Sequence, residues 1–293
     1  MVEPDLGPAA PPALQLGRIG ATAGRGQRDL QECAAAYPDL FPARPFEPAV
    51  FSTIALANAS SAPWLDASRL RVTNRAALWA FGVDRLIDHV ATSRAEVDDI
   101  VERCRAVAAG GQPAPDDALA GMLADLRDRL IAAPAHPELL AIWRDELERM
   151  LTAMVREWDW KSAGTGLPTF DEYLANADNL GFSFVYAAYW ATNAPPGRPA
   201  HVEALRGAAG VVQNAIRLIN DLGSYDRDVR WGDLNVLMLG VDADSVGRRI
   251  AEFADECDAR LRDLPSDHAG LAGYLARQVR FNMGFYPVSD YWV

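Results

Sequence analysis

The chain has 293 residues, half of them hydrophobic, and a formal net charge of −12 at neutral pH. This charge argues against nucleic acid or an anionic membrane as the main partner, because both attract basic surfaces. The three cysteines, Cys33, Cys104 and Cys257, lie far apart and form no CxxC pair, which indicates a reduced, cytoplasmic protein. A spanning helix needs about 20 apolar residues, and the apolar stretch that begins at Gly181 is shorter.

The N-terminal part, residues 1–50, is predicted to be a Pro-rich and partly disordered segment. Prolines crowd its first dozen residues, and the four prolines in residues 38–48 forbid a continuous helix there. From Phe51 onward the apolar residues recur at helical spacing, without the sustained alternation that strands show. We therefore predict a single all-α domain of roughly ten helices over residues 51–293.

Several helices can be placed along the chain. One begins near Arg71, and the clearest begins at Pro137, a residue suited to a first helical turn, with apolar side chains three or four residues apart. Thr169 and Glu172 form a capping box for the next helix, and Gly181 interrupts that helix. Three later helices are expected over residues 200–222, 244–263 and 267–288.

The stretch NDLGSYDRD, from Asn220 to Asp228, carries polar side chains in otherwise helical sequence. Asn220, Ser224 and Asp228 are four residues apart, and because a helix turns about 100° per residue, all three share one face. Their amide, hydroxyl and carboxylate oxygens make a hard ligand set that suits Mg²⁺ rather than zinc or copper. The neighbouring Arg227 could hold an anion bound by that metal. A solvent-exposed polar helix face is the alternative.

A second acidic pair, Asp84 and Asp88, lies in the sequence FGVDRLIDHV, where apolar residues flank both acids. Carboxylates in such a helix are costly to bury unless they are paired or bind a metal. The alternative is that Asp84 pairs with Arg85 or Arg75 at the surface. We expect His89 to be a packed or solvated neighbour, because one histidine beside oxygen ligands does not define a transition-metal site.

Two helices that each present hard oxygens can hold Mg²⁺ between them and so bind a diphosphate, whose departure the metal assists as a Lewis acid. The carbocation that remains needs a dry cavity with aromatic faces. The aromatic residues on these helices fit such a pocket as a set, although core packing is the commoner role of each one alone. They are Phe81, Trp158, Phe182, Phe184, Tyr186, Trp190, Phe281 and Phe285.

The two motifs resemble those of class I terpene synthases, a family that carries DDxxD on one helix and (N/D)Dxx(S/T)xx(K/R)(D/E) on a later one. The first motif reads DRLID here and keeps only its outer acids, Asp84 and Asp88. The spacing of 136 residues between Asp84 and Asn220 is typical of the family. The second motif is complete, with Asp in place of the commoner Glu: Asn220, Asp221, Ser224, Arg227 and Asp228.

The resemblance covers residues 51–293 and implies a class I terpene synthase catalytic domain, a helical bundle around a central apolar cavity. It implies a lyase that breaks the carbon–oxygen bond of a prenyl diphosphate substrate with Mg²⁺ as cofactor. Whether such an enzyme is a monomer or a homodimer is left open. The implied catalytic residues are also the metal ligands: Asp84, Asp88, Asn220, Ser224 and Asp228.

Two departures from the family pattern bear on the substrate. Many microbial terpene cyclases have YLxxR, but here Ala177 stands at the position of that arginine. Many also end with an Arg-Tyr pair, which Asp290 and Tyr291 replace. The YLANA stretch and the FYPVSDYW tail are more similar to labdane-related, ent-kaurene-synthase-like diterpene synthases. This similarity implies a copalyl-type bicyclic diphosphate as substrate, with geranylgeranyl or farnesyl diphosphate as alternatives.

The resemblance also implies roles for residues outside the two motifs. After ionisation the cation would lose a proton, with the released diphosphate as acceptor, or would capture water. The residues implied for diphosphate binding are Arg227, Arg280 and Tyr291. Those implied for the cavity lining are Phe81, Asn176, Ala177, Phe182, Trp190 and Phe285.

Two other functions are compatible with part of the pattern. A chain-elongating prenyl diphosphate synthase is also all-α, but it needs two DDxxD motifs, and NDLGSYDRD is not one. The second is a helical interaction protein without catalytic activity, because the DRLID motif is degenerate and the arginine at position 177 is absent.

Overall fold

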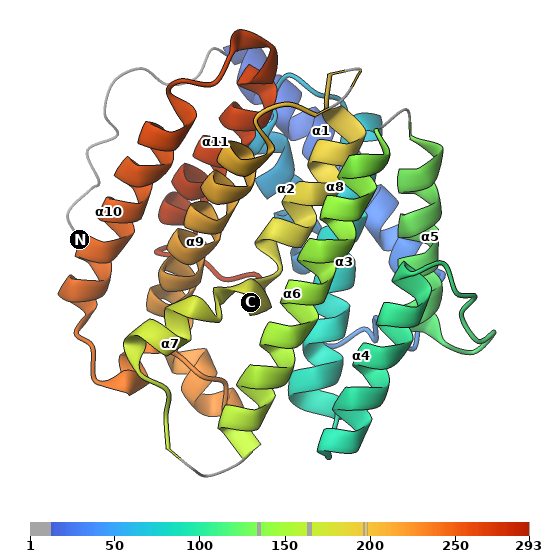
Figure 1. Cartoon of the computed structure of the whole chain (residues 1–293), viewed down its shortest axis with the longest axis vertical. Coiled ribbons are helices and arrows are strands. Elements are labelled where there is room, and N and C mark those ends of the chain that lie inside the picture. The colour runs from blue at the N-terminus through green and yellow to red at the C-terminus, as the bar shows by residue number, and fades with distance from the viewer. Residues whose placement is uncertain (1–12, 134–135, 163–165, 196, 198, 293) are drawn as a thin grey trace.

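The computed structural model describes residues 13–133, 136–162, 166–195, 197 and 199–292. Within these residues there is no β-strand, and the helices assemble side by side into one bundle (Figure 1). This arrangement confirms the predicted all-α fold. The first twelve residues, for which disorder was predicted, lie outside the described part.

Eleven α-helices form the described part of the bundle, joined by shorter helical turns. The α-helices are α1 (Ala13–Ala35), α2 (Pro48–Ser61), α3 (Ala67–Arg85), α4 (Arg94–Ala108), α5 (Ala118–Ala132), α6 (Pro137–Ser162), α7 (Phe170–Ala175), α8 (Phe182–Asn193), α9 (Val202–Trp231), α10 (Ala243–Leu261) and α11 (Ala269–Phe285). The turns are the π-helical η1 (Leu86–Val90) and the 3-10 helices η2 (Ala177–Leu180), η3 (Val236–Leu239) and η4 (Ser266–His268).

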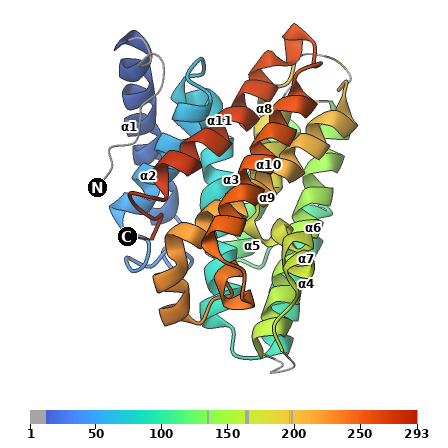
Figure 2. The same ribbon diagram turned by 90° about the vertical axis from the view of Figure 1, so that its left-hand side faces the viewer.

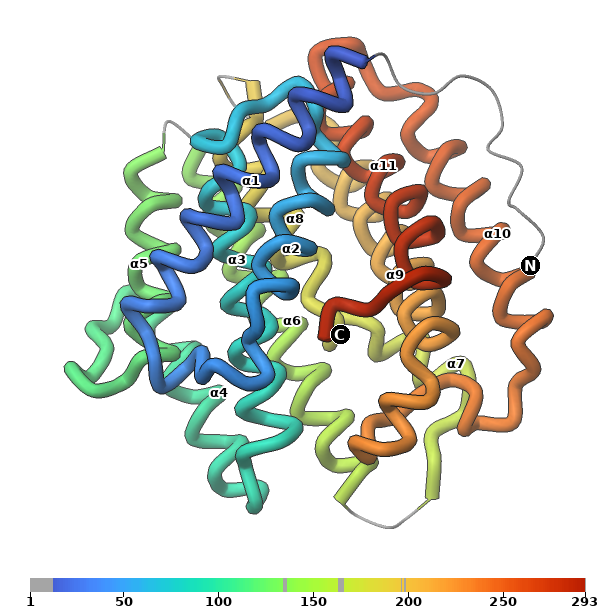
Figure 3. Tube along the Cα trace, turned by 180° about the vertical axis from the view of Figure 1, so that it is seen from behind, coloured from blue at the N-terminus to red at the C-terminus, as the bar shows by residue number. Residues whose placement is uncertain are grey.

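Helix α1 lies inside the segment that was predicted to be Pro-rich and partly disordered. It packs against α2 and α3 (Figure 3) and buries Leu30, Cys33 and Ala34. Gly26 allows the close contact, because a Cβ there would lie 2.8 Å from Nδ2 of Asn74. The sequence did not reveal this helix because its glycines lower helix propensity, which tertiary packing overrides. The packed core therefore extends into the N-terminal segment, and the domain division at residue 51 remains a prediction.

The chain breaks at Gly181, as predicted. Thr169 and Glu172 form the predicted capping box at the start of α7, which is followed by η2. Gly181 then has a φ of 74°, a conformation that strains any residue with a Cβ. A side chain there would also lie 2.7 Å from Sδ of Met150 in α6. The tight turn brings the start of α8 against α6, with which α8 packs.

Helix α9 carries the NDLGSYDRD stretch and is longer than predicted, since it continues to Trp231 instead of ending near residue 222. Gly232 ends it in a left-handed conformation. The backbone N–H groups of Gly232 and Asp233 donate to the carbonyl oxygen of Asp228 at 2.8 and 2.9 Å. Its polar residues do not end the helix, because tertiary partners bind their side chains. Helix α9 packs against both α10 and α11 (Figure 2).

The middle of the bundle is surrounded by α2, α3, α6, α8, α9 and α11. After α11 the C-terminal tail turns back between α2 and α9 (Figure 3). There Trp292 packs edge-on against Phe46, with ring centroids 5.3 Å apart, and lies 6.3 Å from the ring of Trp231. None of the described helices combines the length and the apolar character that crossing a membrane would require.

Candidate active site

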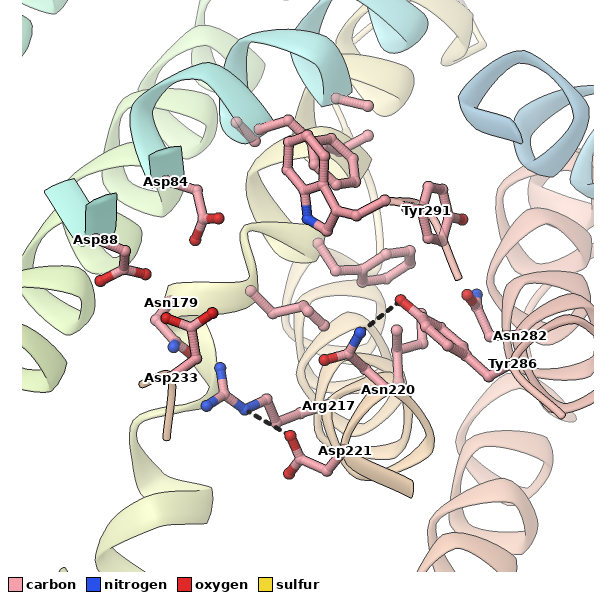
Figure 4. Close-up of a pocket in the computed structure, with 18 of the residues that line it drawn as sticks. Asp84, Asp88, Asn179, Arg217, Asn220, Asp221, Asp233, Asn282, Tyr286 and Tyr291 are labelled. Atoms are coloured by element: carbon pink, nitrogen blue, oxygen red, sulfur yellow. Dashed lines mark hydrogen bonds and ion pairs between the residues drawn. The ribbon is translucent and has the colours of Figure 1, made fainter. Parts of the chain in front are cut away.

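A cavity of about 200 Å³ lies in the middle of the bundle. Figure 4 shows acidic residues of α3 and η1 on one side of it and polar residues of α9 on the other. Its apolar wall includes Ala77, Ala80, Phe81, Met154, Phe182, Val185 and Ile216. Its charged and amide lining includes Asp84, Asp88, Glu157, Asn179, Arg217, Asn220, Asp221, Asp228 and Asp233.

Asp84 lies at the end of α3 and Asp88 lies in η1, so the predicted acid pair does face the cavity. Burial, and then repulsion from Asp88, raise the pKa of Asp84 well above its usual value. The alternative in which Asp84 pairs with Arg75 is wrong, because Nε and Nη2 of Arg75 donate to Asp29 at 2.9 Å each. Asp84 is therefore a carboxylate that the surrounding protein leaves short of positive charge.

Asp88 has a cationic partner that the sequence analysis missed. Nζ of Lys161, on α6, donates to Oδ1 of Asp88 at 2.6 Å and to Oδ1 of Asp233 at 3.4 Å. Burial lowers the pKa of Lys161, but its attraction to the two carboxylates outweighs burial and raises the pKa overall. His89 lies 3.6 Å from Asp233 and packs edge-on against Trp231, so it is a neighbour of this cluster, as expected.

Asn220, Ser224 and Asp228 lie along α9 as predicted, but only Asn220 and Asp228 reach the cavity wall. Oδ2 of Asp228 accepts hydrogen bonds from Oγ of Ser224 at 2.6 Å and from Nδ2 of Asn235 at 2.8 Å. Its Oδ1 accepts from Nη2 of Arg227 at 2.8 Å. Both oxygens of Asp228 are therefore occupied in this conformation, and Ser224 is buried against it.

A buried ion network lies next to Asn220 on α9. Nε of Arg217 donates to the hydroxyl of Tyr173 at 2.6 Å, and Nη2 donates to Oε2 of Glu157 at 3.1 Å. Tyr173 in turn donates to Oδ2 of Asp221 at 2.9 Å. Burial raises the pKa of Asp221 to about 7, although Arg217 and Tyr173 both act to lower it. The guanidinium group of Arg217 lines the cavity (Figure 4).

Sequence reasoning missed five residues that the fold brings to this site: Glu157, Lys161, Asn179, Arg217 and Asp233. Two of them could have been found from the sequence. Arg217 stands three residues before Asn220 and hence on the same side of α9. Lys161 is the only lysine in a chain with 27 arginines. Asn179 and Asp233 could not be found in this way, because they lie in a 3-10 turn and a loop, where α-helical spacing does not apply.

Two of the three residues implied for diphosphate binding line the cavity. Arg227 donates to Asp228 and also to Asp290 of the C-terminal tail. Tyr291 lies beside Phe81, with ring centroids 5.4 Å apart.

Arg280 does not reach the cavity, so its predicted role is wrong. Its side chain is 72% exposed and lies 3.9 Å from Asp258. The physical reason is helical geometry: position 280 is about 200° around α11 from the cavity-lining Gln278 and Asn282. It therefore points to the outside of the bundle.

Phe81 and Phe182 line the cavity as predicted, whereas Asn176, Ala177, Trp190 and Phe285 are not part of its wall. Nδ2 of Asn176 donates to the carbonyl oxygen of Ala153, and Trp190 packs against Tyr186. Phe285 stacks on Phe281 outside the wall. Helix α8 is buried almost all round, so its apolar pattern does not reveal which side faces a cavity.

The donor atoms fit a hard divalent cation, although they do not converge in this conformation. In the described part of the chain, no three His, Cys, Asp or Glu side chains come close enough to hold a metal ion. All candidate donors are oxygens, the set that such cations prefer. Oδ1 of Asn179 is buried without a hydrogen-bond partner. Burial and repulsion from Asp88 also raise the pKa of Asp84, which indicates a carboxylate that lacks positive charge.

An all-helical bundle with oxygen-rich helices facing each other across an aromatic-lined cavity defines an enzyme of the class I terpene synthase type. Residues 75–257 match the family described as terpene synthase family 2, C-terminal metal binding, and the chain belongs to this family. The predicted enzyme class is therefore confirmed, and a bound divalent metal is expected. The alternative of a non-catalytic interaction protein loses its support.

Individual relatives agree with the family assignment. Over 272 residues the chain is 28% identical to the ent-pimara-9(11),15-diene synthase of Streptomyces sp. (strain KO-3988), covering 90% of this chain and 89% of that protein. The fold of this chain is similar to that of 2-methylisoborneol synthase from Streptomyces coelicolor A3(2), with a TM-score of 0.73 and 15% identity. The match covers 97% of this chain and 96% of that one. The fold is also similar to that of the SVS_A2 protein from ancestral sequence reconstruction, with a TM-score of 0.71, 18% identity and coverage of 93% and 87%.

Proposed function

We propose that this protein is a Mg²⁺-dependent diterpene synthase that ionises a C20 prenyl diphosphate, of the copalyl type, and cyclises or rearranges the resulting carbocation. The cavity itself carries this proposal. Oxygen-rich side chains of α3, η1 and α9 face one another, and aliphatic and aromatic side chains form the rest of the wall. One region is thus suited to a charged diphosphate and the other to a hydrocarbon.

The proposed metal ligands are Asp84 and Asp88 on one side and Asn220, Ser224 and Asp228 on the other. Bound Mg²⁺ would assist departure of the diphosphate as a Lewis acid. Ser224 and Asp228 would first have to exchange the 2.6 Å hydrogen bond between them for contacts to the metal. The choice of metal is supported by the 2-methylisoborneol synthase structure, which contains Mg²⁺ and 2-fluoroneryl diphosphate.

Arg227, Tyr291 and Arg217 are the proposed diphosphate-binding residues. Arg227 lines the cavity beside the metal-binding face of α9 but is bonded to Asp290, which the diphosphate would have to displace. Arg217 is proposed in place of the arginine that is absent at position 177, because its guanidinium group borders the same part of the cavity as Asn179 and Asp233.

The choice of a C20 substrate rests on sequence similarity. The relative at 28% identity is named for an ent-pimaradiene, which is a C20 hydrocarbon. Geranylgeranyl or farnesyl diphosphate as the direct substrate is the alternative. A cytoplasmic location remains a prediction.

The test is incubation of the purified protein with Mg²⁺ and, separately, farnesyl, geranylgeranyl and the stereoisomeric copalyl diphosphates, followed by gas chromatography with mass spectrometry. We expect a cyclic diterpenoid from a copalyl diphosphate. Turnover of geranylgeranyl diphosphate alone would contradict the copalyl-type substrate. A folded protein that converts none of these substrates would contradict the whole proposal, and a longer prenyl diphosphate formed with added isopentenyl diphosphate would indicate chain elongation instead.

A further inference from the structure

Three polar side chains of α11 and that of Tyr286, which directly follows the helix, face the cavity in a row: Tyr274, Gln278, Asn282 and Tyr286. They are four residues apart, so successive members lie about 40° apart around the helix axis. Each is more than nine-tenths buried. We call this row the α11 polar face. It lies on the side of the cavity opposite Asp84 and Asp88, as its two labelled members in Figure 4 indicate.

Tyr274 and Gln278 of the α11 polar face belong to a hydrogen-bond network with α2. The hydroxyl of Tyr274 donates to Oδ1 of Asn58 at 2.6 Å, and Nε2 of Gln278 approaches the same oxygen at 3.4 Å. Nδ2 of Asn58 donates to Asn74 at 2.8 Å. These contacts hold the side chains of Tyr274 and Gln278 at the cavity wall.

Asn282 is the member of the α11 polar face with unused hydrogen-bonding capacity. Its Nδ2 donates to the backbone carbonyl of Gln278 at 2.8 Å and approaches Oε1 of Gln278 at 3.4 Å. Its Oδ1 has no hydrogen-bond donor among the described residues, although the side chain is only 2% exposed and lines the cavity. Because Oδ1 of Asn282 borders the cavity and accepts no hydrogen bond from the described residues, this position favours a ligand that donates a hydrogen bond.

A hydrocarbon cannot satisfy these groups, but a water molecule can. A buried water needs two to four polar partners and about 10–15 Å³ of cavity space. The amides of Asn282 and Gln278 and the hydroxyl of Tyr274 supply the partners, and the cavity of about 200 Å³ has ample room. The part of the wall formed by Ala77, Ala80 and Phe81 offers no side-chain hydrogen bonds.

We propose that the α11 polar face binds a water molecule that attacks the carbocation, so that the enzyme releases a diterpene alcohol. This inference rests on the proposed function. A lone pair of the water oxygen forms the new C–O bond, and the protonated alcohol then loses one proton. The diphosphate released at ionisation accepts that proton. The row ends at Tyr286, whose hydroxyl accepts a 2.8 Å hydrogen bond from Nδ2 of Asn220, so the proton is lost close to the proposed diphosphate site.

The test is product analysis after turnover in H₂¹⁸O with the substrate that the protein accepts. We expect the main product to be an alcohol that carries ¹⁸O. Gln278→Leu and Asn282→Leu should each lower the ratio of alcohol to hydrocarbon by about tenfold, the effect of one lost hydrogen bond to the water. Substrate consumption should change much less, because ionisation takes place at the metal-binding side.

Met283→Leu is the matched control, since Met283 is the exposed neighbour of Asn282 on the same helix, and it should leave the product ratio unchanged. Melting temperatures show whether each variant is folded, and labelling of the unsubstituted enzyme does not depend on any variant. Products that are all hydrocarbons, or an alcohol whose oxygen comes from the diphosphate ester, would overturn this inference while leaving the proposed function intact. Absence of turnover with every prenyl diphosphate would overturn both.

Discussion

Lys161 donates a hydrogen bond of 2.6 Å from Nζ to Oδ1 of Asp88 and thus places an ammonium group among the acids proposed to bind metal. Its charge also lies 3.4 Å from Asp233. A lysine ammonium is a compact point charge, and in this conformation it supplies part of the positive charge that the metal would bring. Metal binding and the Lys161 contact are therefore expected to compete for Asp88.

Lys161→Met tests this competition. The ion pair is partly buried, so its loss should cost more than the roughly 0–1 kcal/mol of an exposed pair and less than the roughly 3–5 kcal/mol of a buried one. The metal-free variant should therefore have a lower melting temperature. Mg²⁺ should then raise that temperature more than in the parent, because Asp88 is free to bind it. Arg105→Met is the control, since Arg105 forms an exposed pair with Glu148. An equal Mg²⁺ response in variant and parent would contradict the competition.

Asp84→Asn separates stability from activity. The raised pKa of Asp84 means that its ionised form destabilises the metal-free protein, so the neutral amide should raise the melting temperature near neutral pH. Loss of a charged metal ligand should lower turnover by about 100-fold or more. Circular dichroism and product formation measure the two effects.

Asn220→Ala and Asp228→Ala should also remove most turnover and leave helicity intact. Asp98→Asn, at an exposed pair with Arg94, should change neither property.

Asp290→Asn should strengthen diphosphate binding. Arg227 donates to both Asp228 and Asp290, so an incoming diphosphate must displace a carboxylate of the tail. With Asp290 neutralised, the affinity for inorganic diphosphate in the presence of Mg²⁺ should rise by about tenfold, equivalent to one charge-assisted contact of about 1.4 kcal/mol. Isothermal calorimetry measures it, with Ser289→Ala as the neighbouring control. Weaker binding would mean that Asp290 orders Arg227 for the ligand.

Gly223→Ala should weaken the contact between α9 and α11. A Cβ at position 223 would lie 2.8 Å from Cβ of Tyr286 and 3.0 Å from its carbonyl oxygen. Overpacking of this kind costs about 1–3 kcal/mol, and it should also disturb the hydrogen bond from Asn220 to Tyr286. Gly210→Ala, on the same helix with no atom within 4 Å, should instead stabilise the protein by up to about 1 kcal/mol. Chemical denaturation should therefore show a lower free energy of unfolding for Gly223→Ala and a higher one for Gly210→Ala than for the parent.

The metal-free protein should lose stability as pH rises toward neutrality, in part through Asp221. Burial raises the pKa of Asp221 from 3.8 to about 7. Between these values the native state keeps a proton that the unfolded chain has lost, so the free energy of unfolding falls as pH rises from about 4 to about 7, by at most about 4 kcal/mol from this group. In the Asp221→Asn variant, the free energy of unfolding should fall less over this pH range. Asp258→Asn, an exposed control, should follow the parent, and identical curves for all three proteins would exclude this contribution.

The sequence by itself determined what depends on local helical geometry. Residues four apart on one helix share a face whatever surrounds them, which is why the spacing aligned Asp84 with Asp88 and Asn220 with Asp228. The capping box at Thr169 and the break at Gly181 were predictable for the same reason. Each depends only on residues a few positions apart.

The tertiary structure alone decided which distant segments meet. Lys161 reaches Asp88 across 73 residues, and Asn58 meets Tyr274 across 216. Such contacts depend on how the helices pack, and no local period encodes them. The same reason explains the errors: Arg280 and Trp190 stood at plausible positions in the sequence, but the orientation of α11 and α8 turned them away from the cavity. The motif on α9 could be recognised in the sequence, whereas the residues that its side chains contact, Asn235, Tyr286 and Asp290, became visible only in the folded bundle.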